Sequence, residues 1–293
     1  FVPFYKSNSH AGTGKFLVAE ADESDGTIIK FKGELGVLTN LELDHTNYYL
    51  NLRSLIKTIK KFNQNCNQFL ANYDCPTIRS NFKSSTIWWS NKTKDKVNYA
   101  AIPISMNGKE TIANFYENGH FVGEINIPLA GLHNLSNVTG AISTCRLAGI
   151  SFQKLKETVT QLKAPNRRFQ FRGIWNKRQI VDDYAHHPSE ISATLSMSNL
   201  MISSQKSTLP EVPKRIVAVF QPHRFSRTRD FIDGFAKSLL NANEVILAPI
   251  YGAGEKEIDG INNQLLASCI KQKEPTFPVT AVNNFDDLIN QIK

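Results

Sequence analysis

The sequence predicts an α/β protein built from two successive domains, and three observations lead to this fold class. Short apolar runs such as residues 35–39 end in polar loops, as buried parallel strands do. Apolar residues with helical spacing follow, as at Leu52, Leu55 and Ile59. The same alternation restarts after Pro165. The order fits a central, mostly parallel sheet with a small antiparallel insert, followed by a Rossmann-like α/β domain.

The first domain is expected over residues 1–165. The Asn118-Gly119 pair between two strand-like runs predicts a tight hairpin, because Asn-Gly tolerates positive φ. Gly149 suits the end of a helix. The stretch 76–98 is rich in Ser, Thr, Asn and Lys. The expected strands are 16–19, 35–39, 97–104, 111–116 and 121–127, and the expected helices are 52–62, 135–147 and 152–162.

The second domain is expected over residues 166–293, where strand-like and helix-like runs alternate again. The polar, proline-containing segment 203–213 is expected to be a surface loop. The expected strands are 169–175, 179–184, 215–220, 244–248 and 277–282, and helices are expected after Pro188, at 228–240, at 263–271 and at the end of the chain.

Composition limits the class of protein. No apolar run approaches the roughly 20 residues of a membrane span and no signal-peptide core is visible, so we expect a cytoplasmic protein without membrane insertion. The 4 cysteines are scattered and form no CxxC pair, which predicts reduced structural thiols. The formal net charge of +8 favours anionic partners. Because the positive residues are dispersed, we do not expect nucleic-acid binding.

Two polar loops follow the first expected strands. Residues 20–25 contain four carboxylates, which are the oxygen ligands that a hard cation such as Mg²⁺ prefers, although such loops are often only solvated. Asp44 and His45 follow the next strand, so both loops are expected at one edge of the sheet. Gly12, Gly14 and Lys15 do not form a phosphate loop, because no strand precedes them and Phe16 follows the lysine.

Three further constellations lie at expected strand ends or helix starts. Asn134 and Asn137 share one helix face, and either they contact a ligand or Asn134 caps the helix. The run VDDYAHHPSE at 181–190 holds metal ligands, acid and base groups, or merely the polar end of a strand. Arg224 and Arg227 are expected to face outward and to offer planar donors to a carboxylate or phosphate, more readily than to serve as plain surface charge.

Taken in order, seven stretches resemble the Mur ligase family, and they span residues 17 to about 256. They are VAEADESDG, TNLELDH, GLHNLSN, RRF, VDDYAHHPSE, FQPHRFSRT and IYGAGE. The resemblance implies an enzyme, an ATP-dependent carboxylate–amine ligase of peptidoglycan precursor synthesis. FQPHRFSRT, together with Tyr184 and Glu190, favours the member that adds L-alanine over the related ligase that recycles murein peptides.

The resemblance also implies substrates, cofactors and residue roles. The lactyl carboxylate of UDP-N-acetylmuramate would be activated by ATP and Mg²⁺ as an acyl phosphate, which the amine of L-alanine then attacks. The implied residues are Glu20 and His45 for the metal, with His45 also catalytic; Asn134, Asn137, Arg168 and Asp183 for the nucleotide; and Tyr184, His186, Arg224 and Arg227 for L-alanine and the acyl phosphate, the last three also as catalytic residues.

The sequence also departs from the family pattern. We expect a chain that lacks the family's UDP-binding domain, its glycine-rich phosphate loop and its final glycine-containing segment. Thr46 and Asn47 replace the usual Met and Asp after the Asp-His pair. These departures predict that residues 1–293 fold but do not catalyse ligation alone.

Two other classes of protein remain open. Asp44, His45, Asp182 and Asp183, with His186 and His187, are the types of ligand that a metal-dependent phosphoesterase with two metals uses. A non-catalytic basic module that binds nucleotide or nucleic acid is the other alternative, and steep salt dependence of DNA binding would support it.

Overall fold

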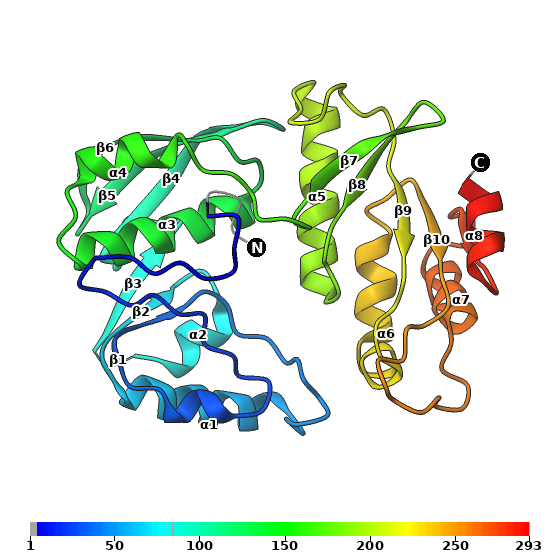
Figure 1. The fold of residues 1–293 in the computed structure, drawn as a ribbon, viewed down its shortest axis with the longest axis horizontal. Coiled ribbons are helices and arrows are strands. Elements are labelled where there is room, and N and C mark those ends of the chain that lie inside the picture. Colours follow the sequence, from blue (N-terminus) through cyan, green and yellow to red (C-terminus); the bar gives the residue numbers. More distant parts are fainter. Residues whose placement is uncertain (1–4, 84, 293) are drawn as a thin grey trace. The chain divides into compact units, whose positions relative to one another are not determined.

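The structure, a computed structural model, describes residues 5–83 and 85–292. The chain forms two compact units, residues 1–163 (unit 1) and 164–293 (unit 2). Each unit is an α/β fold with parallel strands, and each also contains antiparallel strands (Figure 1). The predicted fold class is therefore confirmed.

Unit 1 is built on a six-stranded sheet whose strands lie in chain order. The pairings among β1 to β4 are parallel and the pairings of β5 with β4 and β6 are antiparallel, which gives the predicted combination of a parallel core and an antiparallel insert. The strands are β1 (Gly33–Leu38), β2 (Cys66–Asn72), β3 (Thr86–Ser90), β4 (Tyr99–Met106), β5 (Thr111–Glu117) and β6 (His120–Ile127).

The helices of unit 1 bury two separate apolar clusters against this sheet. α1 (Leu52–Gln64) and α2 (Pro76–Asn81) pack with Phe69 and Ala71 of β2. α3 (Leu132–Leu147) and α4 (Phe152–Val159) pack over β4, β5 and β6 (Figure 1). A short 3-10 helix, η1 (Thr27–Lys30), precedes β1. In β3, Trp88 packs with the first cluster and Trp89 lies beside Gly140 of α3, so alternate residues of this strand serve different layers.

One expected strand is absent, and four elements of the described residues were not predicted, namely η1, β2, α2 and β3. Residues 16–19 form no strand, and Leu17 and Val18 are 94% and 91% exposed. An apolar run becomes a buried strand only where other elements cover it, and no described element covers this one. The first half of β2 is polar, with Asn67 and Gln68 exposed. α2 and β3 lie within the stretch 76–98 that is rich in Ser, Thr, Asn and Lys, and α2 buries only Ile78.

Unit 2 contains a hairpin and a separate three-stranded parallel sheet. β7 (Gln170–Trp175) and β8 (Arg178–Asp182) form the antiparallel hairpin. The parallel sheet has the order β11-β10-β9, from β9 (Val217–Phe220), β10 (Glu244–Leu247) and β11 (Val279–Ala281). The helices are α5 (Pro188–Ser204), α6 (Phe225–Leu239), α7 (Asn263–Lys273) and α8 (Phe285–Ile292).

The central strand β10 has a helical layer on each face, which is the Rossmann-like arrangement that the sequence predicts. Val245 and Leu247 belong to an apolar cluster with α5, α6 and α7. Ile246 points the other way and packs with Leu288 of α8. None of the helices in the described ranges is long and apolar enough to cross a membrane. The candidate residues of unit 2 lie before β7, in the loops after β8 and β9, and in the first turn of α6.

Candidate functional site

The acidic loop at residues 20–25 meets the His45 loop, although the strand that was expected to precede it at residues 16–19 does not form. His45 lies in the loop after β1, and its Nε2 is 3.5 Å from Glu23 Oε1 and 3.9 Å from Asp44 Oδ2. The hydroxyl of Tyr49 donates a hydrogen bond of 2.6 Å to the backbone oxygen of Glu23, which ties one loop to the other. The geometry therefore gathers two carboxylates around one imidazole.

Hydrogen bonds within the acidic loop favour ionised carboxylates. The backbone N–H of Ser24 lowers the pKa of the Asp22 carboxyl, and the Ser24 hydroxyl and the nearby His45 act in the same direction. The hydroxyl and backbone N–H of Thr27 lower the pKa of Asp25. The loop is thus a set of anionic oxygens beside His45, which is the chemistry that Mg²⁺ prefers.

Glu20, the predicted metal partner of His45, lies elsewhere in this loop. Its side chain is exposed, in a segment without regular structure, and the carboxylates that lie against His45 are those of Glu23 and Asp44. Within residues 5–83 and 85–292, no group of three or more His, Cys, Asp or Glu side chains is arranged to hold a metal. Assignment of Glu20 to a metal therefore stays a prediction, and Glu23 is a contact that sequence reasoning missed.

The first turn of α3 stands beside the carboxyl end of β2. Asn72, the last residue of β2, donates from Nδ2 to Ser136 Oγ at 3.3 Å. Asn134 donates to the backbone oxygen of Ala130 at 2.7 Å, and Asn137 is exposed. Gly131 holds the N-cap position with φ 93°, so the alternative in which Asn134 caps the helix is wrong. Backbone N–H groups at such a helix start suit an anion.

In unit 2, Asp183 joins the turn after β8 to the segment before β7. Its Oδ2 accepts the backbone N–H of Phe169, and its Oδ1 accepts that of Ala185, both at 2.8 Å. The backbone N–H of Tyr184 donates to the oxygen of Arg167, whose guanidinium lies 4.6 Å from the centre of the tyrosine ring. Both oxygens of Asp183 therefore hold backbone in place.

The two adjacent histidines have different surroundings. His187 is the N-cap of α5, where its side chain accepts the backbone N–H of Ser189 in a capping box with Glu190. His186 places Nδ1 3.0 Å from the backbone oxygen of Tyr184 and 3.4 Å from Glu190 Oε2. Arg168 Nη1 lies 3.6 Å from Glu190 Oε1. His187 thus starts a helix, whereas His186 lies outside the helix, beside Tyr184 and the Glu190 carboxylate.

This arrangement gives no support to the phosphoesterase alternative. Asp183 and His187 are engaged with backbone groups, and Asp182 lies 3.5 Å from the Nε of Arg167. As stated above, the residues that the structure describes contain no metal-ligand group of the required size.

The loop after β9, the first turn of α6 and the loop after β10 bring together a histidine, two arginines and a glutamate. Arg224 has φ 71° and is the N-cap of α6; its Nη1 donates to Glu255 Oε1 at 3.3 Å. Ser226 donates to the same carboxylate from its backbone N at 3.0 Å and from its hydroxyl at 2.7 Å. Arg227 is only 6% exposed, with Nη1 3.1 Å from His223 Nδ1. The expectation that both arginines face outward is therefore not met for Arg227.

The surroundings of His223 keep it neutral and those of Glu255 keep it charged. Burial, followed by the positive charges of Arg227 and Arg224, lowers the pKa of His223. Burial pushes the pKa of Glu255 upward, but the hydrogen bonds from Ser226 and Arg224 outweigh it and lower the pKa overall. Both residues lie in motifs that carry the family resemblance, FQPHRFSRT and IYGAGE, but the sequence alone assigned neither of them a role. The place of His223 directly before Arg224 could have indicated one.

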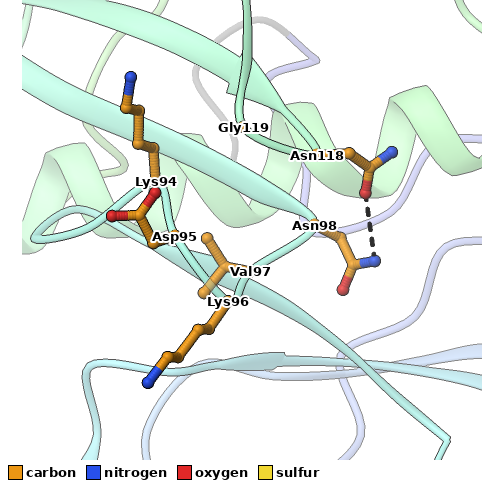
Figure 2. A pocket seen from close by; sticks show the side chains of 7 residues that line it. All are labelled: Lys94, Asp95, Lys96, Val97, Asn98, Asn118 and Gly119. Carbon is orange, nitrogen blue, oxygen red and sulfur yellow. Dashed lines mark hydrogen bonds between the residues drawn. The ribbon is translucent and has the colours of Figure 1, made fainter.

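A hollow of about 410 Å³ lies elsewhere on unit 1. It is bounded by residues 94–98 and by the turn between β5 and β6 at Asn118 and Gly119. Figure 2 shows Asn98 bonded to Asn118, while Lys94 and Lys96 extend in opposite directions. None of the candidate site residues that the sequence singles out lines it, and an open hollow with diverging lysines offers no convergent polar groups.

The two units match two domains of one family. Residues 6–145 match the Mur ligase middle domain, and residues 167–293 match the Mur ligase, glutamate ligase domain. The fold and these matches define the class: the chain belongs to the Mur ligase family.

Individual relatives narrow the comparison. The chain is 54% identical over 287 residues to a UDP-N-acetylmuramate–L-alanine ligase of Prochlorococcus marinus strain MIT 9303, in an alignment that covers 98% of this chain and 59% of that protein. It is 52% identical over 287 residues to the ligase of the same name from Synechococcus sp. strain CC9605, with coverage of 98% and 61%. The chain thus spans about three fifths of the length of the curated relatives it matches.

Solved structures agree on the fold. A UDP-N-acetylmuramate–alanine ligase from Thermotoga maritima aligns with a TM-score of 0.70 at 22% identity, over 93% of this chain and 56% of that one. A murein peptide ligase from Psychrobacter arcticus aligns with a TM-score of 0.61 at 18% identity, over 90% and 52%. At these identities the likeness concerns the fold alone.

Proposed function

We propose that this chain serves the ATP-dependent ligation of L-alanine to the lactyl carboxylate of UDP-N-acetylmuramate, in peptidoglycan precursor synthesis in the cytoplasm. The observation that carries the proposal is the identity of more than half of the residues, along nearly the whole chain, to ligases named for this reaction. The motifs that carry the family resemblance hold His45, Asn134, His186 and Arg227.

The proposed reaction has two steps. A lactyl carboxylate oxygen attacks the γ-phosphorus of ATP, ADP leaves, and an acyl phosphate forms. The amine nitrogen of L-alanine then attacks the acyl carbon, phosphate leaves with its bonding electrons, and the nitrogen gives up a proton to a base. Because the protein forms no covalent bond in either step, it contributes chiefly by positioning and by neutralising charge.

Unit 1 would serve the nucleotide and its magnesium ion. Glu20 and His45 are the proposed protein ligands, and the Glu23 and Asp44 carboxylates beside His45 supply further oxygens within the same loops. Mg²⁺ retains several waters and shares its shell with substrate phosphates, so two protein ligands fit it even without a larger preformed cluster. When bound, the ion neutralises phosphate charge. Asn134 and Asn137 would contact the nucleotide at the start of α3.

Unit 2 would serve L-alanine, the acyl phosphate and part of the nucleotide. Arg168 and Asp183 are proposed for the nucleotide, although Asp183 also holds two backbone N–H groups. Tyr184, His186, Arg224 and Arg227 are proposed for L-alanine and the acyl phosphate. An arginine presents several N–H donors in a plane, which suits the two oxygens of a carboxylate.

We further propose that residues 1–293 alone do not complete the ligation. The mechanism requires backbone N–H groups and a lysine around the β- and γ-phosphates. Gly12, Gly14 and Lys15 are exposed, and Phe16 to Ala19 behind them form no helix. Within the described residues no glycine-rich loop leads from a strand directly into a helix.

The test compares two proteins. One is this chain, and the other is a chimera that adds the stretch of the Prochlorococcus relative that the chain does not match. Phosphate release is measured with ATP, Mg²⁺ and UDP-N-acetylmuramate, with L-alanine or with a murein peptide as the amine. We expect L-alanine-dependent release from the chimera only. Release that depends on the murein peptide would favour the recycling ligase, and nucleotide binding without release would favour a non-catalytic role.

A residue-level test in the chimera concerns Arg227. Arg227→Ala should raise the KM for L-alanine strongly and leave the KM for ATP nearly unchanged. Arg229→Ala is the matched control, because Arg229 is paired with Asp230 and half exposed. Equal losses for both substrates would contradict the assignment of Arg227 to L-alanine.

A further inference from the structure

The partners of a histidine ring reveal which of its nitrogens carries hydrogen. An arginine guanidinium can only donate hydrogen bonds, whereas a backbone carbonyl or an ionised carboxylate can only accept them. A ring nitrogen beside an arginine must therefore bring a lone pair, and one beside a carbonyl must bring a hydrogen. In a neutral imidazole the other nitrogen then has the opposite role.

His223 lies beside a donor. Its Nδ1 is 3.1 Å from Arg227 Nη1, so Nδ1 must accept and the hydrogen of the neutral ring sits on Nε2. The backbone holds the ring in this position: His223 pairs with Tyr251 in a parallel bridge, and Arg224 N donates to Tyr251 O at 2.8 Å. Because Arg227 is almost fully buried, its guanidinium has little freedom to turn away.

His186 lies beside acceptors. Its Nδ1 is 3.0 Å from the backbone oxygen of Tyr184 and 3.4 Å from Glu190 Oε2. The Glu190 carboxylate also accepts the backbone N–H groups of His186 and His187, which fixes its position at the start of α5. Nδ1 of His186 must therefore carry the hydrogen, and Nε2 of the neutral ring is left with a lone pair.

We propose that the two histidines are held in opposite tautomers, Nδ1–H for His186 and Nε2–H for His223, and that together they recognise the amine and carboxylate of an amino acid. Their ring centres are 6.4 Å apart. One ring offers a lone pair, which suits an amine, and the other offers an N–H, which suits a carboxylate oxygen. The tautomers follow from the contacts alone, whereas L-alanine as the ligand rests on the proposed function.

Burial, and after it the charged neighbours, lower the pKa of His223 and favour its neutral form. The groups around it are Arg224 and Arg227 of α6, His186 of the loop after β8, and Tyr251 and Glu255 of the loop after β10. Of these, only Glu255 favours protonation of His223, and its carboxylate is already bonded to Ser226 and Arg224. Protonation would place two cations at the 3.1 Å contact with Arg227. The neutral ring of His223 thus holds Arg227 through Nδ1 and keeps Nε2–H for the ligand.

Nitrogen NMR of the chain labelled with ¹⁵N-histidine tests the tautomers directly. At neutral pH we expect an unprotonated Nδ1 and a protonated Nε2 for His223, and the reverse for His186. Peaks are assigned by His→Asn variants, each of which removes one ring. His187 is an internal reference, because as an N-cap acceptor it should share the tautomer of His223. The same tautomer for His186 and His223, or a charged His223, would overturn the proposal.

Removing the donor gives a second test. Arg227→Leu should convert His223 to a mixture of tautomers and leave His186 unchanged, while Arg229→Leu should leave both unchanged. The backbone amide spectrum reports whether each variant folds. If Arg227→Leu fails to fold, Arg227→Lys should still donate to Nδ1 and preserve the tautomer of His223. Loss of the tautomer in the lysine variant with an intact fold would also count against the proposal.

Ligand titration separates this inference from the proposed function. L-alanine added to the chimera should shift His186 Nε2 and His223 Nε2, and inorganic phosphate should shift only His223. In the His223→Asn variant the amide oxygen replaces Nδ1 as the acceptor for Arg227, so Arg227 stays placed, but the KM for L-alanine should rise about tenfold because the Nε2–H is lost. Opposite tautomers with no response to L-alanine would leave the tautomers standing and reject the amino-acid ligand.

Discussion

Replacement of Glu255 by glutamine should destabilise unit 2, because this carboxylate anchors the start of α6. It accepts three hydrogen bonds, from the Ser226 backbone N at 3.0 Å, the Ser226 hydroxyl at 2.7 Å and Arg224 Nη1 at 3.3 Å, and its side chain is 20% exposed. A hydrogen bond to a charged group contributes about 1.5–3 kcal/mol. Glutamine keeps one accepting oxygen but turns an NH₂ group toward one of the donors. We expect a loss of about 2 kcal/mol in the free energy of unfolding, since one bond is lost and partial exposure weakens the remainder.

The loss should depend on pH in a defined direction. The pKa of the folded Glu255 carboxyl is lowered, so its ionised form stabilises the fold at all pH values above the unfolded pKa of about 4.3. This contribution disappears as pH falls through the folded pKa, because the carboxyl then takes up a proton and resembles glutamine. The difference between wild type and Glu255→Gln should therefore be largest near neutral pH and shrink in acid.

Urea unfolding measures both effects. With a slope of about 1–3 kcal/mol per molar urea, a loss of about 2 kcal/mol moves the midpoint of unit 2 by roughly 1 M at neutral pH. Glu257→Gln is the matched control, because Glu257 is a neighbouring exposed glutamate and its midpoint should not move. Equal midpoints for wild type and Glu255→Gln, or a difference that persists unchanged in acid, would refute the anchoring role.

Two further predictions concern unit 1. Gly140→Val should cost about 1–3 kcal/mol of stability, because a Cβ at this position lies 3.1 Å from the ring of the fully buried Trp89. Ala141→Val, on the exposed side of α3, should cost less. Thermal unfolding of both variants measures the difference. In calorimetric titrations of the chimera, Glu23→Gln should weaken Mg²⁺-dependent ATP binding at least as much as Glu20→Gln, because Glu23 is a carboxylate that contacts His45. An effect of Glu20→Gln alone would show that the contact between Glu23 and His45 does not serve the metal.

Much of the fold follows from local patterns in the sequence. The Asn118-Gly119 turn forms as predicted, with both residues at positive φ, and Gly149 ends α3 at φ 85°. These features depend on a few neighbouring residues, so the sequence suffices. The failed strand at 16–19 and the unpredicted β2 depend on what covers a segment, which apolar periodicity within that segment does not contain.

For the candidate residues, too, the sequence predicts some features and misses those that depend on tertiary contacts. The sequence predicts that the acidic loop and the His45 loop lie together at the ends of two neighbouring strands, and the two loops do meet, although residues 16–19 form no strand. It does not predict that Glu23 is the residue that contacts His45, nor that Arg227 is buried against His223. Both depend on the direction of individual side chains, and a shift of one residue along a loop changes the partner.

Neighbouring residues in VDDYAHHPSE acquire distinct roles from the start of a single helix. The N-cap of α5 has an extended backbone, so the side chain of His187 turns back onto its own first turn and is occupied there. His186, one residue earlier, is outside the helix, and the Glu190 side chain that completes the capping box reaches its backbone N–H and lies near its ring. The same carboxylate that stabilises α5 thereby orients the imidazole of His186. Because one side chain serves both purposes, changes at Glu190 should disturb the tautomer of His186 and the start of α5 together, whereas changes at His187 should disturb the helix alone.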